Sequence, residues 1–300
     1  MNHLRAKGRA SRTLDKYQFC FDLLEKIAKD RGVKKVSDVD LNLIDAFRAD
    51  RIAGNTAEKR KPAAPKTITN DIVSIKQLVN FCVKRKLIRE NPLSDLEIRK
   101  PPRTIQPVWS RDEVQAILNK ARSPFLEPLI FYADSGARFG EGRWLTWKDV
   151  DLEKGVVHIQ PKQGWKPKTG EQRVFHMSER MKEMFGQMPK KYRWVFTAKP
   201  TARYPEKGRQ ISERTLLTYL RRIPDELGLE GHLHTFKHSF VTHALIDLKV
   251  PREVIRRSVG TLDDRVLDYY VHVHDQEAQN MMKLVSGTYR KTTEDNDPLK

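Results

Sequence analysis

The sequence predicts a mainly α-helical protein with one small β-sheet, divided into two domains. Apolar residues recur every three to four positions over long stretches, which is the periodicity of helices with one buried face. Two short strand-like runs stand apart from this pattern, at 155–160 and 173–177. A length of 300 residues favours two domains. A proline-rich, basic stretch at 99–107 is the predicted linker between them.

The chain is strongly basic. It contains 57 Lys and Arg against 39 Asp and Glu, for a net charge of +18 at pH 7. This excess is larger than the roughly 2–8 charges that keep a small domain soluble, and it favours a polyanionic partner over a mere solubility charge. We find no long apolar run, signal-like start or lipidation motif that favours a membrane. The predicted partner is therefore DNA, and the predicted location is cytoplasmic and nucleoid-associated.

Residues 1–98 are predicted to form a helical domain. Apolar stripes mark three helices. Ser11 or Thr13 is the predicted cap of the first, the second is predicted to follow Asp38 or Asp40, and the third is predicted to begin at Thr67 and to end before the Asn-Pro pair at 91–92. The proline-containing, basic segment 54–66 is predicted to be a loop. Cations on the polar face of the third helix are candidate DNA contacts, with a merely solvated face as the alternative: Lys76, Lys84, Arg85 and Lys86.

Residues 108–286 are predicted to form the second domain, followed by a polar tail at 287–300. Ser110 and Glu113 have the spacing of a capping box, which predicts the start of a helix directly after the linker. The two strand-like runs enclose a basic turn at 161–170. Further helices are predicted at 216–223, 235–248, 251–259 and 275–286.

The first group of candidate functional residues surrounds Arg138. The stretch Asp-Ser-Gly-Ala-Arg-Phe-Gly-Glu at 134–141 places this arginine at a helix start, after a glycine turn. Its guanidinium then lies beside backbone N–H groups without helical partners, which is a favourable position for a phosphate oxygen. Glu141, one turn later, is predicted to support Arg138 or the beginning of the helix. A purely structural arginine is the alternative.

The basic turn between the strands contains a candidate general acid, Lys168. The flexible stem and adjustable pKa of a lysine suit proton donation once DNA covers the turn. Lys166 is a competing candidate two residues earlier, and a solvated lysine is the ordinary alternative. Lys162, Lys166 and Arg173 are predicted to contact DNA.

The third group is His234-Thr-Phe-Lys237. A spacing of three puts both basic side chains on one helical face, so both are expected to reach one phosphate. His234 and His238 also have the spacing of helical zinc ligands. The glutamate of a His-Glu-x-x-His site is absent, because position 235 is Thr, and no cysteine pair lies nearby in sequence. We therefore predict no metal site.

No cofactor is predicted either. The sequence has neither a Gly-x4-Gly-Lys-Ser/Thr phosphate loop nor an acidic cluster suited to two metal ions. The two cysteines, Cys20 and Cys82, fall on the apolar stripes of predicted helices. They are predicted to be buried thiols in a reducing compartment rather than a disulfide.

The fourth group begins at Gly260-Thr261 and continues, nine residues later, with Tyr270. The hydroxyl of Thr261 can donate one hydrogen bond. Tyr269 is the competing tyrosine, and a histidine two residues after Tyr270 favours the latter. A tyrosine alone in a helix is ordinarily a core or surface residue, so its interest depends on the other three groups.

Together, the four groups resemble the tyrosine recombinase (phage integrase) family. The string around Arg138 is similar to the family's Thr-Gly-Leu-Arg-x-x-Glu box, and Lys168-Thr-Gly-Glu-Gln-Arg is similar to its Lys-Thr-Gly-x-x-Arg hairpin. The Thr-Gly pair after Lys168 favours this lysine over its neighbour at 166. Two positions depart from the pattern. Lys237 stands where the family has arginine, and Thr261 stands where it usually has His or Trp.

The resemblance, which spans roughly 11–285, implies the residues' roles. The phenol of Tyr270 would attack a DNA phosphate and form a 3′-phosphotyrosyl link. The family's pattern further implies that the charge on the phosphate is stabilised by Arg138, His234 and Lys237, with a hydrogen bond from Thr261. Lys168 would protonate the departing 5′-oxygen. Lysine keeps the positive charge of arginine but loses its two-pronged geometry, which permits slow activity or none.

The resemblance also implies a C-shaped clamp of a core-binding domain (1–98) and a catalytic domain (108–286) around double-stranded DNA. Four copies would act on two recombination sites, linked by the C-terminal helix, and accessory directionality factors are possible partners. The predicted function is site-specific recombination. The alternatives are a catalytically impaired DNA-binding protein of the same fold and a type IB topoisomerase-like enzyme.

Overall fold

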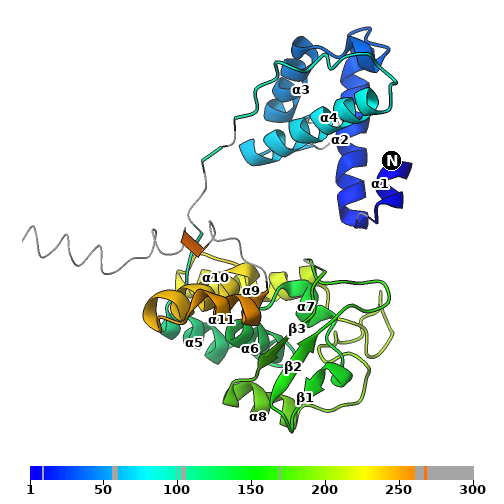
Figure 1. The fold of residues 1–300 in the computed structure, drawn as a ribbon. Helices are drawn as coiled ribbons and strands as arrows, with labels where there is room; N and C mark the ends of the chain where they lie inside the picture. Colours follow the sequence, from blue (N-terminus) through cyan, green and yellow to red (C-terminus); the bar gives the residue numbers. More distant parts are fainter. Residues whose placement is uncertain are drawn as a thin grey trace, which may run out of the picture. The chain divides into compact units, whose positions relative to one another are not determined.

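The chain forms two separate compact units in a computed structural model, Met1–Thr104 and Ile105–Lys300. Figure 1 shows both. The structure describes residues 1–8, 10–55, 60–99, 101–102, 106–168, 170–260 and 267–268. The division between the units lies within the predicted linker at 99–107. No helix in the described part of the chain is long and apolar enough to cross a membrane.

Unit 1 is helical, as the sequence predicts. Its elements are α1 (Asn2–Ala6), α2 (Ser11–Asp30), the 3₁₀ turn η1 (Val36–Asp38), α3 (Leu41–Ala53) and α4 (Pro65–Lys84). The side chain of Asp40 caps α3 by accepting a 2.8 Å hydrogen bond from the backbone N–H of Leu43. Pro65 begins α4, where its missing N–H costs nothing. Helix α4 ends seven residues before Asn91, in agreement with a predicted end before the Asn-Pro pair, and Lys86 takes a left-handed conformation with φ +58° just beyond it.

The core of unit 1 forms where α2, α3 and α4 pack together. Its fully buried members include Ile44, Phe47 and Ile75. Cys20 and Cys82 are buried free thiols, which confirms that part of the prediction, and burial raises the pKa of Cys20 to about 12. A buried ion pair between Arg51 and Asp71, 2.9 Å from Nε to carboxylate, joins α3 to α4.

Unit 2 combines helices with one three-stranded sheet, which confirms the predicted class. In order, its described elements are α5 (Arg111–Lys120), α6 (Leu126–Ser135), α7 (Phe139–Arg143), η2 (Trp147–Asp149), β1 (Val150–Asp151), β2 (Val156–Ile159), β3 (Arg173–His176), α8 (Glu179–Gln187), α9 (Glu213–Leu227), α10 (Leu233–Thr242), η3 (His243–Asp247) and α11 (Arg252–Val259). The predicted capping box of Ser110 and Glu113 is present at the start of α5.

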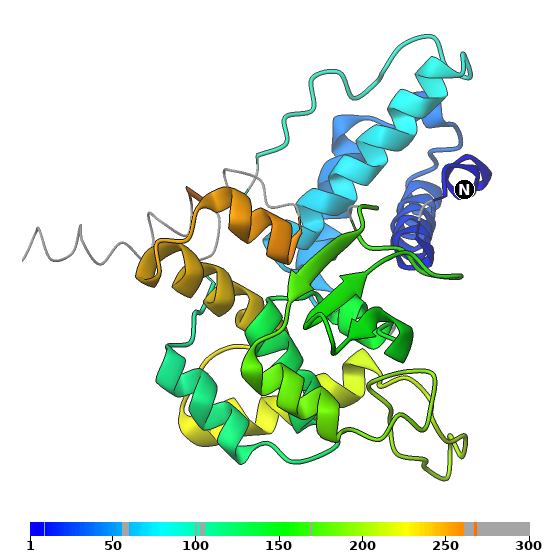
Figure 2. The ribbon, with the colours of Figure 1, turned by 60° about the horizontal axis from the view of Figure 1, so that its bottom comes forward.

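The sheet is antiparallel in the order β1-β2-β3, with Val157 opposite Phe175 in its central pair. The two-residue strand β1 is absent from the prediction, because it is too short to show alternation. Helix α10 packs on α6, α6 packs on α8, and α11 lies beside β3 (Figure 2). The long helix predicted at 235–248 is in fact α10 followed by the π-helical turn η3.

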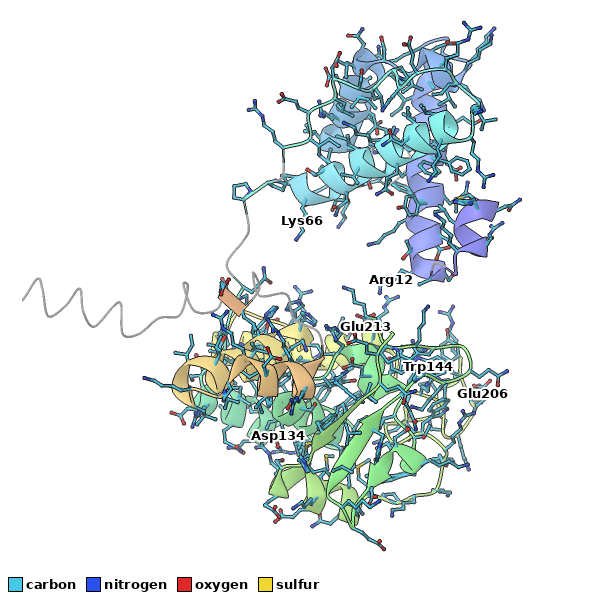
Figure 3. All side chains as sticks on the ribbon, viewed as in Figure 1. Arg12, Lys66, Asp134, Trp144, Glu206 and Glu213 are labelled. Atoms are coloured by element: carbon cyan, nitrogen blue, oxygen red, sulfur yellow. The ribbon has the colours of Figure 1, made fainter. Side chains whose placement is uncertain are left out.

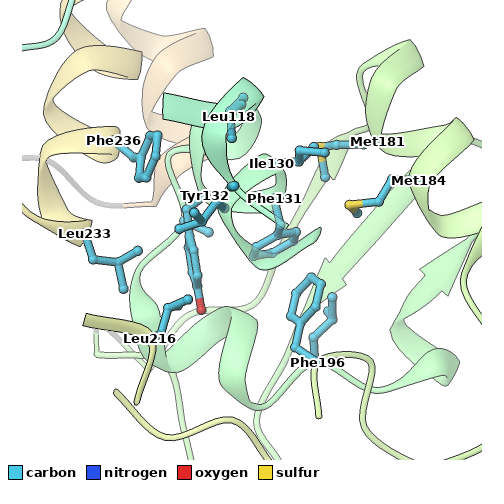
Figure 4. Packing of buried hydrophobic residues seen from close by; sticks show 14 of the residues in the cluster. Leu118, Ile130, Phe131, Tyr132, Met181, Met184, Phe196, Leu216, Leu233 and Phe236 are labelled. Carbon is cyan, nitrogen blue, oxygen red and sulfur yellow. The ribbon is translucent and has the colours of Figure 1, made fainter. Parts of the chain in front are cut away.

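An aromatic core holds the sheet of unit 2 to its helices. The Phe131 ring of α6 lies at its centre, with ring centroids 5.4 Å from Phe196 and 6.0 Å from Phe175. Figure 4 shows Phe131 between Phe196 and the side chains of Ile130 and Tyr132. Because α6 is buried on nearly every side, its C-terminal end is held rigidly. Candidate functional residues follow directly after that end.

Candidate active site

Arg138 is positioned by the sharp turn between α6 and α7. Gly136 ends α6 with φ +58°, and a Cβ atom there would lie 2.8 Å from the Phe240 ring, so glycine is required. Arg138 then caps α7. Its backbone N–H donates a 2.6 Å hydrogen bond to Oε2 of Glu141, and its guanidinium lies 3.5 Å from Oε1 of the same carboxylate. Glu141 therefore contacts both the backbone at the start of α7 and the side chain of Arg138, which corresponds to both of the roles predicted for it.

Glu141 is buried and belongs to a second ion pair. Arg173 of β3 donates two hydrogen bonds to its carboxylate, each 2.7 Å, and Nε of Arg173 donates a 2.9 Å bond to the backbone carbonyl of Ser258 in α11. Burial alone would raise the pKa of Glu141, but Arg173 and Arg138 together hold it below its ordinary value. Arg173 thus links β3 to α7 through Glu141 and to α11 through Ser258. The prediction that Arg173 contacts DNA does not fit this arrangement, because its guanidinium is buried and committed to these bonds.

Lys237 is buried among the same segments. Only 4% of its surface is exposed, and its Nζ donates hydrogen bonds to the backbone carbonyls of Gly136 at 2.9 Å and Val259 at 3.0 Å. Burial, with the charges of Arg138 and Arg173, lowers the pKa of Lys237 to about 7. The ammonium therefore joins the end of α6 to the end of α11. The prediction that Lys237 and His234 both reach one phosphate did not include these two hydrogen bonds, which use two of the three N–H donors of the ammonium.

His234 is exposed at the start of α10. Partial desolvation of its ring lowers its pKa to about 4, with the positive charges of Lys237, His232, Arg138 and Lys168 acting in the same direction. His234 is therefore neutral at pH 7, and the nearby cations disfavour its protonation. Its ring stacks edge-on against His238, with centroids 5.1 Å apart. Among the described residues, no third ligand joins the two histidines in a group that could hold a metal ion.

Lys168 is exposed on the turn between β2 and β3. The N–H of Gly170 donates a 2.8 Å hydrogen bond to the carbonyl of Pro167, so Lys168 occupies a tight turn. Lys166 is also exposed. Lys162 is different, because its ammonium lies 3.0 Å from the buried carboxylate of Asp149. The prediction that Lys162 contacts DNA therefore does not fit the structure.

Gly260 brings the fourth group toward the others. A Cβ atom at this position would lie 3.3 Å from Nη1 of Arg173 and 3.4 Å from Nη1 of Arg138. The backbone that follows α11 thus passes directly beside both guanidinium groups. Thr261, Tyr269 and Tyr270 lie outside the described residues, as does the helix predicted at 275–286.

The predicted DNA contacts of unit 1 divide into two kinds. Lys84, Arg85 and Lys86 are exposed at the end of α4. Lys76 is half-buried, and its Nζ donates a 2.9 Å hydrogen bond to the carbonyl of Leu96. The side chain of Lys76 therefore ties the segment after α4 back onto the helix, and only the other three cations have the exposure that a phosphate contact needs.

A group of tryptophans beside the site escapes the sequence analysis. Trp144 follows α7 directly (Figure 3), and its ring stacks on Trp165 of the basic turn, with centroids 6.0 Å apart. Trp194 meets the same Trp144 ring edge-on at 5.4 Å. Two of these tryptophans are close in sequence to the arginine and lysine motifs. That closeness is the signal by which the sequence could have indicated the group.

Comparison with known proteins agrees with this arrangement. The family model described as the phage integrase family matches residues 108–277. Tyrosine recombinase XerC of Xanthomonas campestris pv. campestris (strain B100) is 25% identical over 291 residues, which cover 91% of this chain and 83% of that protein. XerC of Lactobacillus delbrueckii subsp. bulgaricus (strain ATCC BAA-365 / Lb-18) is 25% identical over 236 residues, covering 71% of this chain and 74% of its own.

Solved structures show the same fold. The integrase of the transposon Tn1549, in complex with a circular intermediate DNA, superposes with a TM-score of 0.67 at 18% identity, covering 94% of this chain and 97% of that one. A lambda integrase dimer bound to a COC′ core site gives a TM-score of 0.65 at 14% identity, covering 88% of this chain and 92% of that one.

Proposed function

The chain belongs to the phage integrase family, and from that premise we propose that it is a tyrosine-type site-specific recombinase that cuts and rejoins DNA through a 3′-phosphotyrosyl intermediate. The observation that carries the proposal is the network around Glu141. This carboxylate binds both Arg138 and Arg173, and Lys237 joins the end of α6 to the end of α11. Four segments distant in sequence thereby converge on one positively charged site, which suits a phosphate with developing negative charge.

In the proposed cleavage step, the phenol of Tyr270 loses its proton to solvent, its oxygen attacks phosphorus, and the bond to the 5′-oxygen breaks. Arg138 stabilises the charge on the phosphate oxygens, and Thr261 donates a hydrogen bond. His234 acts as a neutral hydrogen-bonding group at pH 7, since its pKa is about 4. Lys168 gives a proton to the departing oxygen. The phosphotyrosyl bond preserves the energy of the phosphodiester, so a 5′-hydroxyl of another strand reverses the step.

Lys237 contributes to this reaction mainly by holding two backbone segments in place. Its two backbone hydrogen bonds keep the turn before Arg138 close to the end of α11, and they leave at most one N–H of the charged ammonium for DNA. A single proton donor cannot reproduce the planar, two-pronged contact of an arginine. We therefore assign most of the electrostatic stabilisation of the phosphate to Arg138.

We assign DNA positioning to unit 1 (core-binding) and chemistry to unit 2. Support for the first assignment comes from the exposed cations Lys84, Arg85 and Lys86. Lambda integrase has been solved as a tetramer bound to a Holliday junction, so we propose that this chain also acts as a homotetramer on two recombination sites. The predicted C-terminal helix at 275–286 is the proposed link between copies. Accessory directionality factors and a nucleoid location complete the proposal.

The proposal is tested by covalent trapping. The protein is incubated with nicked duplexes tiled from the DNA that flanks its own gene, and the products are separated under denaturing conditions. A nick beside the cleaved phosphate releases a short fragment and prevents religation, so the adduct accumulates. We expect an adduct with wild type and Tyr269→Phe, and none with Tyr270→Phe. Binding without any adduct from wild type would instead support a DNA-binding protein that does not cut.

A further inference from the structure

The stack between Trp144 and Trp165 joins two parts of the proposed active site. The rings are nearly parallel, at 10°, and Trp194 also contacts the Trp144 ring, in an edge-on arrangement. Trp144 immediately follows α7, the helix that Arg138 caps. Trp165 belongs to the turn that carries Lys168. The aromatic group therefore fixes the lysine-bearing turn onto the arginine-bearing helix.

Trp165 also touches α7 itself. A Cβ atom at Gly140 would lie 3.2 Å from Nε1 of Trp165, so the indole lies directly over the helix, two residues from Arg138. Close contact of this kind is possible because Gly140 has no side chain. Stacked aromatic pairs add stability beyond the area that they bury, so this pair helps to hold the short turn in place.

The backbone between Trp165 and Lys168 leaves little freedom. Lys162 and Trp165 exchange two backbone hydrogen bonds of 2.8 and 2.9 Å, and the next anchor, Pro167, is buried. Lys168 follows immediately and is exposed. The position of the Trp165 indole therefore fixes the position of the Lys168 backbone. The flexible side chain of Lys168 determines only how far its ammonium extends.

We propose that Trp165 is a positioning residue for the general acid: its stack on Trp144 places Lys168 against the leaving 5′-oxygen. This inference rests on the proposed function. General acids contribute about 10²–10⁴-fold to rate, and displacement by about 1 Å can cost 10²-fold. Trp165→Ala is therefore expected to slow cleavage by about 10–100-fold without preventing DNA binding.

The experiment compares two versions of the nicked duplex, one with the natural 5′-oxygen at the scissile phosphate and one with sulfur in its place. In both, the phosphorus–tyrosine bond forms as the bond to the leaving atom breaks. A departing oxygen needs a proton, whereas sulfur leaves as a thiolate without one. A defect confined to proton donation therefore disappears on the sulfur substrate, and a general defect of the fold does not.

We expect Trp165→Ala and Lys168→Ala to be slow on oxygen and within about threefold of wild type on sulfur. Trp165→Phe, which keeps a ring for stacking, should recover most of the rate on oxygen. Arg138→Ala is the reference for charge stabilisation and should be slow on both substrates. Trp147→Phe is the matched aromatic control, because Trp147 packs on Phe185 rather than on the turn, and it should resemble wild type.

The inference is overturned if wild type forms adducts and Trp165→Ala is equally slow on both substrates, or unaffected on both. Wild type without an adduct on either substrate would overturn the proposed function together with the inference. Circular dichroism and binding to the same duplexes confirm that each variant is folded, so that a lost rate is not mistaken for a lost structure.

Discussion

Lys237 is expected to lose its proton near neutral pH in the folded protein. Only 4% of its surface is exposed, and burial together with Arg138 and Arg173 lowers its pKa from 10.5 to about 7. In the unfolded chain the lysine keeps its ordinary pKa. Between pH 7 and 10.5 the unfolded state therefore binds more protons than the folded state, and stability must rise with pH in this window.

The size of the effect follows from the shift. Where only the unfolded state holds the proton, each pH unit corresponds to about 1.4 kcal/mol, so the free energy of unfolding should gain about 2–3 kcal/mol between pH 7.5 and 9.5 from this residue alone. Below pH 7 both states carry the proton and the contribution is flat. Lys237→Met removes the titration while keeping an unbranched side chain of similar length. Lys237→Arg keeps a charge that does not titrate in this range.

The assay is urea unfolding followed by tryptophan fluorescence at several pH values. All five tryptophans lie between residues 109 and 194, within unit 2, so the signal reports on the unit that contains Lys237. The quantity of interest is the difference between wild type and each variant, because titrations shared by both proteins cancel. A difference that stays flat from pH 7.5 to 9.5 would refute the reasoning. It would mean that the carbonyls of Gly136 and Val259 hold the ammonium charged despite its burial.

Three further outcomes follow from the same structure. Glu141→Gln breaks a buried ion pair and should lower the unfolding free energy by about 3–5 kcal/mol, while the exposed control Glu183→Gln should not; equal urea curves for all three proteins would contradict this. Cys20 should react with a thiol reagent only after unfolding, because burial raises its pKa to about 12, and rapid modification of the native protein would show otherwise. Replacing Lys84 and Lys86 by Gln should reduce the slope of log affinity for DNA against log salt by about 1.8, and an unchanged slope would remove these lysines from the interface.

Local signals in the sequence predicted where helices begin. The capping box at Ser110 and the cap at Asp40 depend on side chains within three residues of the backbone that they satisfy, so a single sequence contains all the information. The end of α4 was predicted only as lying before the Asn-Pro pair at 91–92. The apolar periodicity continues past Lys84, and only packing of the following turn decides that the helix stops there.

The sequence by itself determined the family resemblance, the helical class and the identity of Arg138 and Lys168 as candidate catalytic groups, because motifs of fixed spacing carry these. Tertiary structure alone decided which cations remain exposed. Arg173 lies 32 residues from Glu141, and Lys237 lies 101 residues from Gly136, yet each pair is in direct contact. A buried charge must find partners that replace its lost hydration, and those partners come from wherever the fold brings polar groups together. Sequence separation carries no information about that choice, so a buried structural cation and an exposed candidate DNA contact cannot be told apart until the chain is folded.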